Sequence, residues 1–201
     1  MSNRIVSVMA LSAALGLAAP LWAQDAAPSD AGAGAAAVSA NAASTKDAAT
    51  ATGATVMPSG HDITPDYQEN GIWYNAEGIP TFNVEDGVVD WATFSGFRRY
   101  HAECHVCHGP DGEGSTYAPA LKNSAMTMDY YDFMQVVASG RQSTNSVMPA
   151  FGTNRNVWCY INDIYVYLLA HGTDTIPRGR PAQRADKPDD YAEMEAACMD
   201  M

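Results

Sequence analysis

Two cysteines and two histidines are grouped within five residues, in the segment Cys104-His105-Val106-Cys107-His108. This C-x-x-C-H spacing is the signature for covalent attachment of a haem. Two thiols three residues apart at the end of a helix can add to the two vinyl groups along one side of a porphyrin. The next histidine then lies beneath the iron. The spacing therefore predicts Cys104 and Cys107 as attachment residues and His108 as the proximal iron ligand.

Two other kinds of site use a C-x-x-C pair, a zinc site and a thioredoxin-like redox site. A zinc site would need a second Cys/His pair at close spacing, but the remaining cysteines, Cys159 and Cys198, stand alone. A thioredoxin-like motif would need a preceding strand, whereas the aromatic spacing at 94, 97 and 100 indicates a helix. We therefore expect one covalently bound haem c.

The second axial ligand decides what such a haem does. Met148 lies in the Pro-containing segment 146–152, far enough after His108 to cross to the other haem face, and a thioether there gives a closed electron-transfer centre. Met126, Met128 and Met134 lie in or beside a predicted helix, where a core role is expected. We interpret Met148 as the ligand. The alternative is a methionine that only packs on the porphyrin and leaves the iron open.

Three helices are expected to position these residues, over residues 93–103, 129–139 and 157–170. The loops between them are long and contain Gly and Pro, which in a compact domain suggests that they wrap a cofactor. Residues 57–92 are predicted to form an irregular extension, with a possible hairpin at Asp86-Gly87.

The N-terminus has the pattern of a secretory signal peptide over residues 1–23: Arg4, then an uncharged apolar stretch, then a small residue. A retained membrane anchor is the alternative. Residues 24–56 are rich in alanine and lack aromatic residues, and we expect a disordered linker. Export predicts a periplasmic location, with no membrane span after cleavage, and an oxidising compartment.

Charge excludes one class of function. The 201 residues carry 11 basic and 23 acidic side chains, a net charge of −12, which is unsuited to binding nucleic acid. The acidity could steer a basic partner or serve solubility alone. The length fits one domain with extensions.

The chain resembles the class I c-type cytochromes over about residues 93–172. The matching positions are Gly96 and Tyr100 before the haem motif, Tyr167-Leu168, Pro119-Ala120-Leu121, and Met148-Pro149 with Phe151. The resemblance implies an all-α fold with helices wrapped around one haem. It also implies that Gly96 permits a close helix crossing and that the Pro119 carbonyl orients the His108 ring.

A closer resemblance is to the four-cysteine cytochromes of methanol metabolism, related to cytochrome cL. It implies a one-electron carrier and not an enzyme. The donor would be a quinoprotein (PQQ) methanol or alcohol dehydrogenase, and the acceptor a smaller cytochrome c or an oxidase. The alternatives are a carrier for another respiratory enzyme and, less favoured, a haem sensor or peroxidase.

Outside the haem motif, an oxidising compartment favours a disulfide between Cys159 and Cys198, clamping the polar tail 173–201 onto the domain. The alternative is two separate thiols. The acidic segment 111–114 is interpreted as a Gly-rich turn, although relatives suggest a calcium site near the haem. The other histidines are interpreted as surface or helix-end residues: His61, His101, His105 and His171.

Overall fold

The structure is a computed structural model that describes residues 56–201. The predicted signal peptide, 1–23, and all but the last residue of the predicted linker, 24–56, lie outside the described residues.

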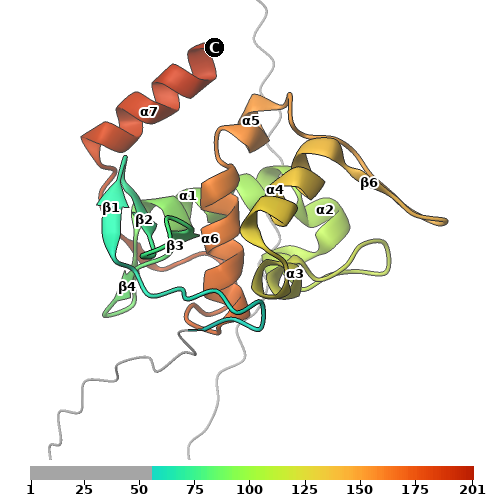
Figure 1. Cartoon of the computed structure of the whole chain (residues 1–201), viewed down its shortest axis with the longest axis horizontal. Helices are drawn as coiled ribbons and strands as arrows, with labels where there is room; N and C mark the ends of the chain where they lie inside the picture. The colour runs from blue at the N-terminus through green and yellow to red at the C-terminus, as the bar shows by residue number, and fades with distance from the viewer. Residues whose placement is uncertain (1–55) are drawn as a thin grey trace, which may run out of the picture. The chain divides into compact units, whose positions relative to one another are not determined.

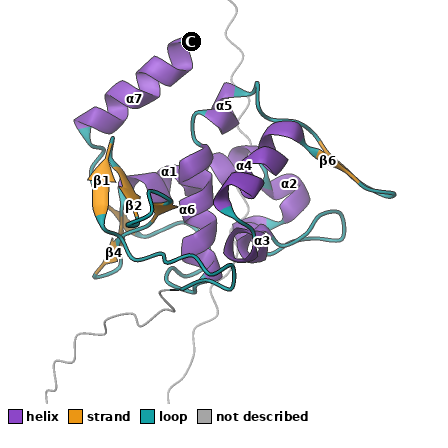
Figure 2. Cartoon of the chain, viewed as in Figure 1, coloured by secondary structure: helices purple, strands orange, loops and turns teal. Residues whose placement is uncertain are grey.

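Helices dominate the described part of the chain, as expected for an all-α protein (Figures 1 and 2). Their bounds are α1 (Trp91–Glu103), α2 (His105–His108), α3 (Leu121–Thr127), α4 (Tyr130–Ser139), α5 (Arg155–Trp158), α6 (Ile161–Gly172) and α7 (Asp189–Asp200), with a short 3-10 turn at Pro110–Gly112. The helices predicted over 93–103 and 129–139 correspond to α1 and α4. The loop that was expected between them contains α3.

The strands are short and form three small sheets. The first contains β1 (Tyr67–Glu69), β2 (Ile72–Tyr74) and β3 (Pro80–Thr81); the second contains β4 (Val84–Glu85), β5 (Val88–Val89) and β8 (Gln183–Arg184). The third pairs β6 (Arg141–Gln142) with β7 (Val147–Met148). The β4–β5 hairpin confirms the turn predicted at Asp86-Gly87, and both residues have positive φ.

Helices α1 and α6 cross closely at Gly96. A Cβ atom at this glycine would lie 1.9 Å from the backbone oxygen of Asp163, so no other residue fits without moving the helices apart. Tyr100 and Tyr167 are both fully buried at this crossing, with ring centroids 5.6 Å apart. The role that the resemblance implied for Gly96 is confirmed by this contact.

The prediction of a single helix over residues 157–170 is wrong. The helical conformation is interrupted at Cys159-Tyr160, between α5 and α6. Tyr160 leaves the helical conformation, with φ −127° and ψ 20°. Its ring lies 3.6 Å beneath the Arg99 guanidinium, and its hydroxyl donates to Glu195 at 2.6 Å. These contacts with α1 and α7 outweigh the local preference for a continuous helix.

The polar C-terminal tail, residues 173–201, ends in a helix, α7, that the sequence analysis did not predict. A disulfide joins Cys159 to Cys198 on α7, with Cα atoms 5.8 Å apart, which confirms the predicted clamp. Tyr191 is fully buried and donates its hydroxyl to Asp163. The helical spacing of the inward residues Tyr191, Met194 and Cys198 was a signal that could have identified α7.

Candidate functional site

One apolar cavity of about 540 Å³ brings the sequence-predicted residues together. Cys104, Cys107, His108, Pro119 and Met148 all line it, although up to 44 positions separate them in the sequence. A volume of this size is typical of sites for large organic ligands and cofactors.

His108 is held in a fixed orientation at this cavity. Its side chain is buried, and its Nδ1 lies 2.9 Å from the backbone oxygen of Pro119. Because a carbonyl oxygen can only accept, Nδ1 carries the proton and Nε2 keeps its lone pair. The Tyr100 hydroxyl donates to the backbone oxygen of Gly109 at 2.6 Å, which anchors the chain directly after His108. This is the arrangement expected of a histidine that binds a metal through Nε2.

The two cysteines of the motif occupy the junction between α1 and α2. Cys104 is the last residue to bond to α1, through its N–H to the oxygen of Tyr100, and Cys107 lies within α2. Neither forms a disulfide, and Cys107 is exposed. The pair therefore presents two sulfurs to the edge of the cavity.

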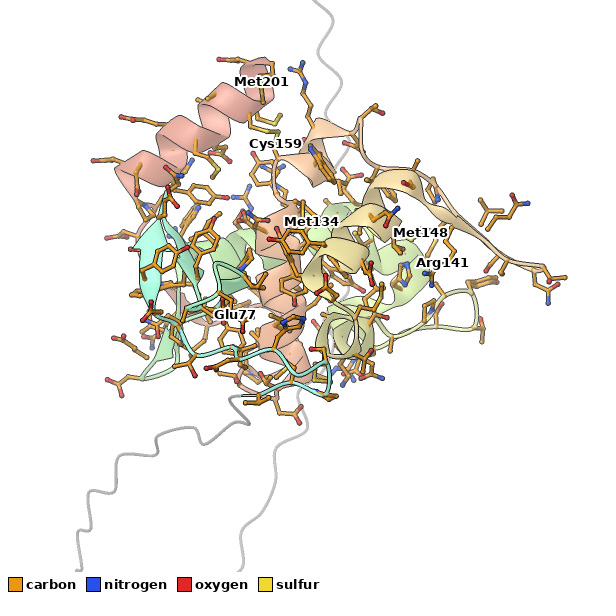
Figure 3. All side chains as sticks on the ribbon, viewed as in Figure 1. Glu77, Met134, Arg141, Met148, Cys159 and Met201 are labelled. Atoms are coloured by element: carbon orange, nitrogen blue, oxygen red, sulfur yellow. A yellow bond between two sulfur atoms is a disulfide. The ribbon has the colours of Figure 1, made fainter. Side chains whose placement is uncertain are left out.

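Met148 reaches the cavity from the β6–β7 hairpin (Figure 3). Gly140, at the end of α4, has φ 71°, and a Cβ there would lie 2.4 Å from the backbone oxygen of Met148. The glycine thus allows the hairpin to turn back against α4. Met126 and Met134 pack against the core, as expected, but Met128 differs because it lines the cavity.

The remaining walls are suited to a flat apolar macrocycle. Phe133, Val137 and Phe151 stand on the α4 side, whereas Val157 and Ile161 close the interior and are almost fully buried. The two cysteines, the oriented imidazole, the thioether and these walls together fit a covalently attached haem.

Comparison with known proteins agrees with this geometry. Residues 92–168 match the family described as cytochrome c oxidase, cbb3-type, subunit III. Cytochrome c-553I of Paracoccus denitrificans is 65% identical over 156 residues, which are 75% of this chain and 69% of that protein. The chain belongs to the class I c-type cytochromes. Cytochrome c-555 of Methylococcus capsulatus is 39% identical over 105 residues, covering 52% of this cytochrome and 80% of that one.

A solved structure shares the fold of this cytochrome. The crystal structure of the c-type cytochrome XoxG from Methylobacterium extorquens AM1 is 52% identical, with a TM-score of 0.65, over 68% of this chain and 86% of that one. Membership of the family implies a covalently bound haem c and a role in electron transfer. Within residues 56–201, no helix combines the length and apolar character needed to cross a membrane.

Asp111 joins the segment after the haem motif to α6 and to residues 178–179 through hydrogen bonds, a structural role that sequence reasoning missed. We interpreted its segment as an ordinary turn, but its carboxylate is buried and accepts from the Tyr167 hydroxyl at 3.1 Å and the Gly179 N–H at 3.1 Å. The Arg178 Nε donates to it at 3.3 Å. Burial alone would raise the pKa of Asp111, but these donors hold it below its ordinary value. The partners lie more than 50 positions away, so no local signal could have found them.

His171 also departs from the sequence interpretation. It lies in the last turn of α6, as a helix-end residue, but only 3% of it is exposed. Its Nε2 is 3.9 Å from Asp111, and burial lowers the pKa of the imidazole. His171 is therefore a buried residue that packs beside the Asp111 carboxylate.

Proposed function

We propose that this cytochrome is a periplasmic one-electron carrier with a single haem c. Cys104 and Cys107 would hold the haem covalently, and His108 and Met148 would bind its iron. The observation that carries the proposal is the convergence of these four residues on one cavity. A haem c held there would supply a one-electron Fe(III)/Fe(II) couple.

The protein's own residues would keep this couple free of side reactions. The Pro119 oxygen fixes the His108 ring, and it would hold the imidazole in one orientation toward a bound haem. Met148 would supply a neutral thioether to the iron, which would favour the ferrous state and keep small molecules from binding. The aromatic and aliphatic side chains in the cavity wall would give the haem a mostly apolar environment.

We propose a quinoprotein methanol or alcohol dehydrogenase as the donor, and a smaller cytochrome c or an oxidase as the acceptor. The resemblance to the four-cysteine cytochromes of methanol metabolism supports this donor, as does the similarity to the cytochrome XoxG. The export signal in the sequence supports the periplasmic location.

Stopped-flow reduction tests the donor. The purified holo-cytochrome is mixed with reduced lanthanide-type methanol dehydrogenase and, separately, with an unrelated periplasmic dehydrogenase. We expect fast, concentration-dependent reduction of the haem only in the first case. Equal slow rates with both donors would reject the methanol assignment and favour a carrier for another respiratory enzyme.

Carbon monoxide tests the axial position independently of the donor. A ferrous haem with both positions occupied binds carbon monoxide slowly or not at all at neutral pH, whereas a haem sensor or peroxidase binds it readily. Rapid binding by the native protein would contradict the proposed electron-carrier role.

A further inference from the structure

We propose that Arg141 binds a propionate group of the haem and couples it to the strand that carries Met148. The proposal rests on the haem site proposed above. In the register of the antiparallel β6–β7 hairpin, Arg141 is directly paired with Met148. Directly paired residues place their side chains on the same face of a hairpin, with Cβ atoms about 5 Å apart. Because Met148 faces the cavity, Arg141 faces it as well.

The charge distribution around the cavity supports this role. A haem carries two propionate carboxylates on the edge of the macrocycle opposite its thioether bonds. Arg141 is the only arginine or lysine among the side chains that line the cavity in the described part of the chain. The one acidic lining residue, Glu103, adjoins Cys104 and would repel a propionate at the thioether edge. The interior wall at Val157, Ile161 and Ile164 cannot solvate a carboxylate.

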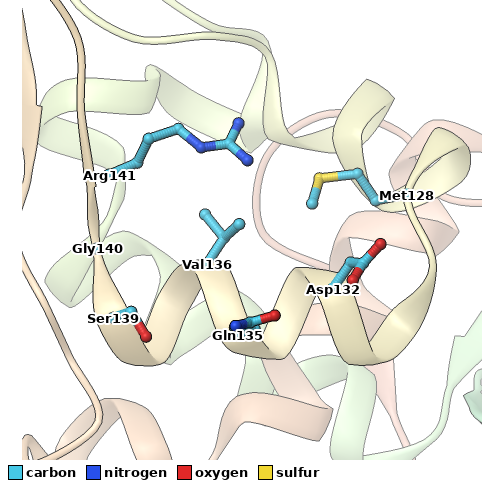
Figure 4. A pocket seen from close by; sticks show the side chains of 7 residues that line it. All are labelled: Met128, Asp132, Gln135, Val136, Ser139, Gly140 and Arg141. Carbon is cyan, nitrogen blue, oxygen red and sulfur yellow. The ribbon is translucent and has the colours of Figure 1, made fainter.

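The N–H donors of the Arg141 guanidinium are available to bind a carboxylate. Within residues 56–201, no carboxylate pairs with it, in contrast to Arg99 and Arg178. Figure 4 shows the side chain extending past Val136 toward Met128, over a smaller cavity of about 380 Å³ next to the haem cavity. Val136, Met128 and Arg141 line both cavities. Arginine is suited to this position because its fork of N–H donors matches a carboxylate in a bidentate pair.

Such a pair would have two consequences. A fixed positive charge beside the haem disfavours the ferric state and raises the reduction potential. It would also attach the β6–β7 hairpin to the cofactor at two points. Arg141 on β6 would bind the propionate, and Met148, its partner on β7, would bind the iron. Arg141 would then be a binding residue for the haem and a positioning residue for its axial ligand.

Redox titration of Arg141→Gln tests the proposal, with Arg98→Gln as the matched control. Arg98 is exposed on α1 and does not line the cavity, so its variant loses the same charge elsewhere. We expect R141Q to favour ferric haem by several-fold to tenfold, and tenfold corresponds to about 59 mV for one electron. The inflection of its potential against pH should move to higher pH, because the propionate has lost its partner. R98Q should change neither property appreciably.

Equal shifts in R141Q and R98Q, or an unchanged pH profile in R141Q, would overturn the proposal. Arg141→Lys is the second variant, because it keeps the charge but loses the bidentate fork. We expect R141K to lie between the wild type and R141Q in potential. If R141Q does not retain haem, R141K carries the test: a potential lowered by less than the 59 mV of a tenfold effect, with the pH inflection moved to higher pH, supports the proposal, and a potential and pH profile equal to those of the wild type reject it. The titration needs no dehydrogenase, so failure of the donor assignment leaves this test intact.

Discussion

Single residues in this cytochrome carry chemistry only because others hold them in place. His108 depends on the Pro119 oxygen, and the Met148 strand depends on the absence of a Cβ at Gly140. Asp111 and Asp163 are buried carboxyls with opposite pKa shifts. Donors lower the pKa of Asp111, whereas burial dominates at Asp163. Predictions at this scale therefore concern ligation and protonation.

Replacing Met148 by alanine is expected to open the iron. The ferric protein should lose the weak far-red charge-transfer band that marks a methionine–iron bond, and the ferrous protein should bind carbon monoxide rapidly. Met128→Leu is the control, because Met128 also lines the cavity but is not the proposed ligand. Loss of the band in the Met128 variant, with the band retained in the Met148 variant, would reverse the ligand assignment.

Asp163 is expected to make folding less favourable as pH rises. Burial raises its pKa from 3.8 to about 7, so the folded protein keeps a proton that the unfolded chain has released. The stabilisation is complete below pH 4 and is lost as pH rises through 7; a difference of this size is worth about 4 kcal/mol. Asp163→Asn removes the titration, so its free energy of unfolding relative to the wild type should increase between pH 4 and 7.

Chemical denaturation at several pH values measures this difference. The control is Glu193→Gln, which changes an exposed carboxylate on the neighbouring helix α7. A constant difference between Asp163→Asn and the wild type across this range would contradict the expectation.

At the scale of elements, two features hold the helices around the site. One is the close α1–α6 crossing at Gly96, and the other is the clamp that joins α7 to the start of α6 through the Cys159–Cys198 disulfide. Tyr191 adds a buried contact between α7 and α6 through Asp163. Gly96, Cys159 and Cys198 do not themselves line the cavity.

Gly96→Ala is expected to destabilise the fold although alanine is the better helix former. The gain in helix propensity is about 1 kcal/mol, but the new Cβ would lie 1.9 Å from the Asp163 oxygen and force the helices apart. We expect a net loss of about 3 kcal/mol, in the upper range for overpacked sites. Thermal unfolding measures it against Arg98→Ala, an exposed substitution on the same helix. A more stable Gly96 variant would show that the crossing relaxes freely.

Removing the disulfide is expected to weaken the fold but not the haem site. The bridge spans 39 positions, for which the chain-entropy treatment gives about 4 kcal/mol. The double variant Cys159→Ser, Cys198→Ser should unfold at lower denaturant concentration. Its absorption spectrum should match the wild type, because neither cysteine lines the cavity. A changed axial-ligand spectrum would mean that the clamp also positions the haem ligands.

At the scale of the whole molecule, the acidity is not spread evenly along the chain. Residues 142–154, which include the Met148 strand, contain no charged side chain. Three exposed apolar residues line the cavity or adjoin its lining in sequence: Tyr117 and Val147 line it, and Val106 precedes Cys107; they are 76%, 69% and 77% exposed. We call these three residues the apolar rim. Contact through this rim would bring a partner next to the haem without using the net charge.

Charge placed on the rim is therefore expected to slow electron transfer from the donor. Val147→Asp should lower the second-order rate of reduction by about tenfold, because docking would bury an unpaired carboxylate. Tyr131→Asp is the control, since Tyr131 is 64% exposed on α4 but does not line the cavity. Equal rates in the two variants would place the docking surface elsewhere.

Sequence reasoning identified residues that the structure brings together at one cavity, Cys104, Cys107, His108, Pro119 and Met148, and the motif residues among them are neighbours in the chain. The C-x-x-C-H spacing places two sulfurs and an imidazole within five residues. The class of fold and the Cys159–Cys198 pairing also followed, since the other two cysteines are assigned to the haem and export favours oxidation.

Tertiary structure alone decided the features that depend on residues distant in sequence. The break at Tyr160 arises from Arg99 and Glu195, and the lowered pKa of Asp111 arises from Tyr167, Arg178 and Gly179. Local propensity contains no information about such partners, because each contact forms only when the chain has folded. The pairing of Arg141 with Met148 belongs to the same group: the residues are seven positions apart, and the hairpin register places both at the cavity.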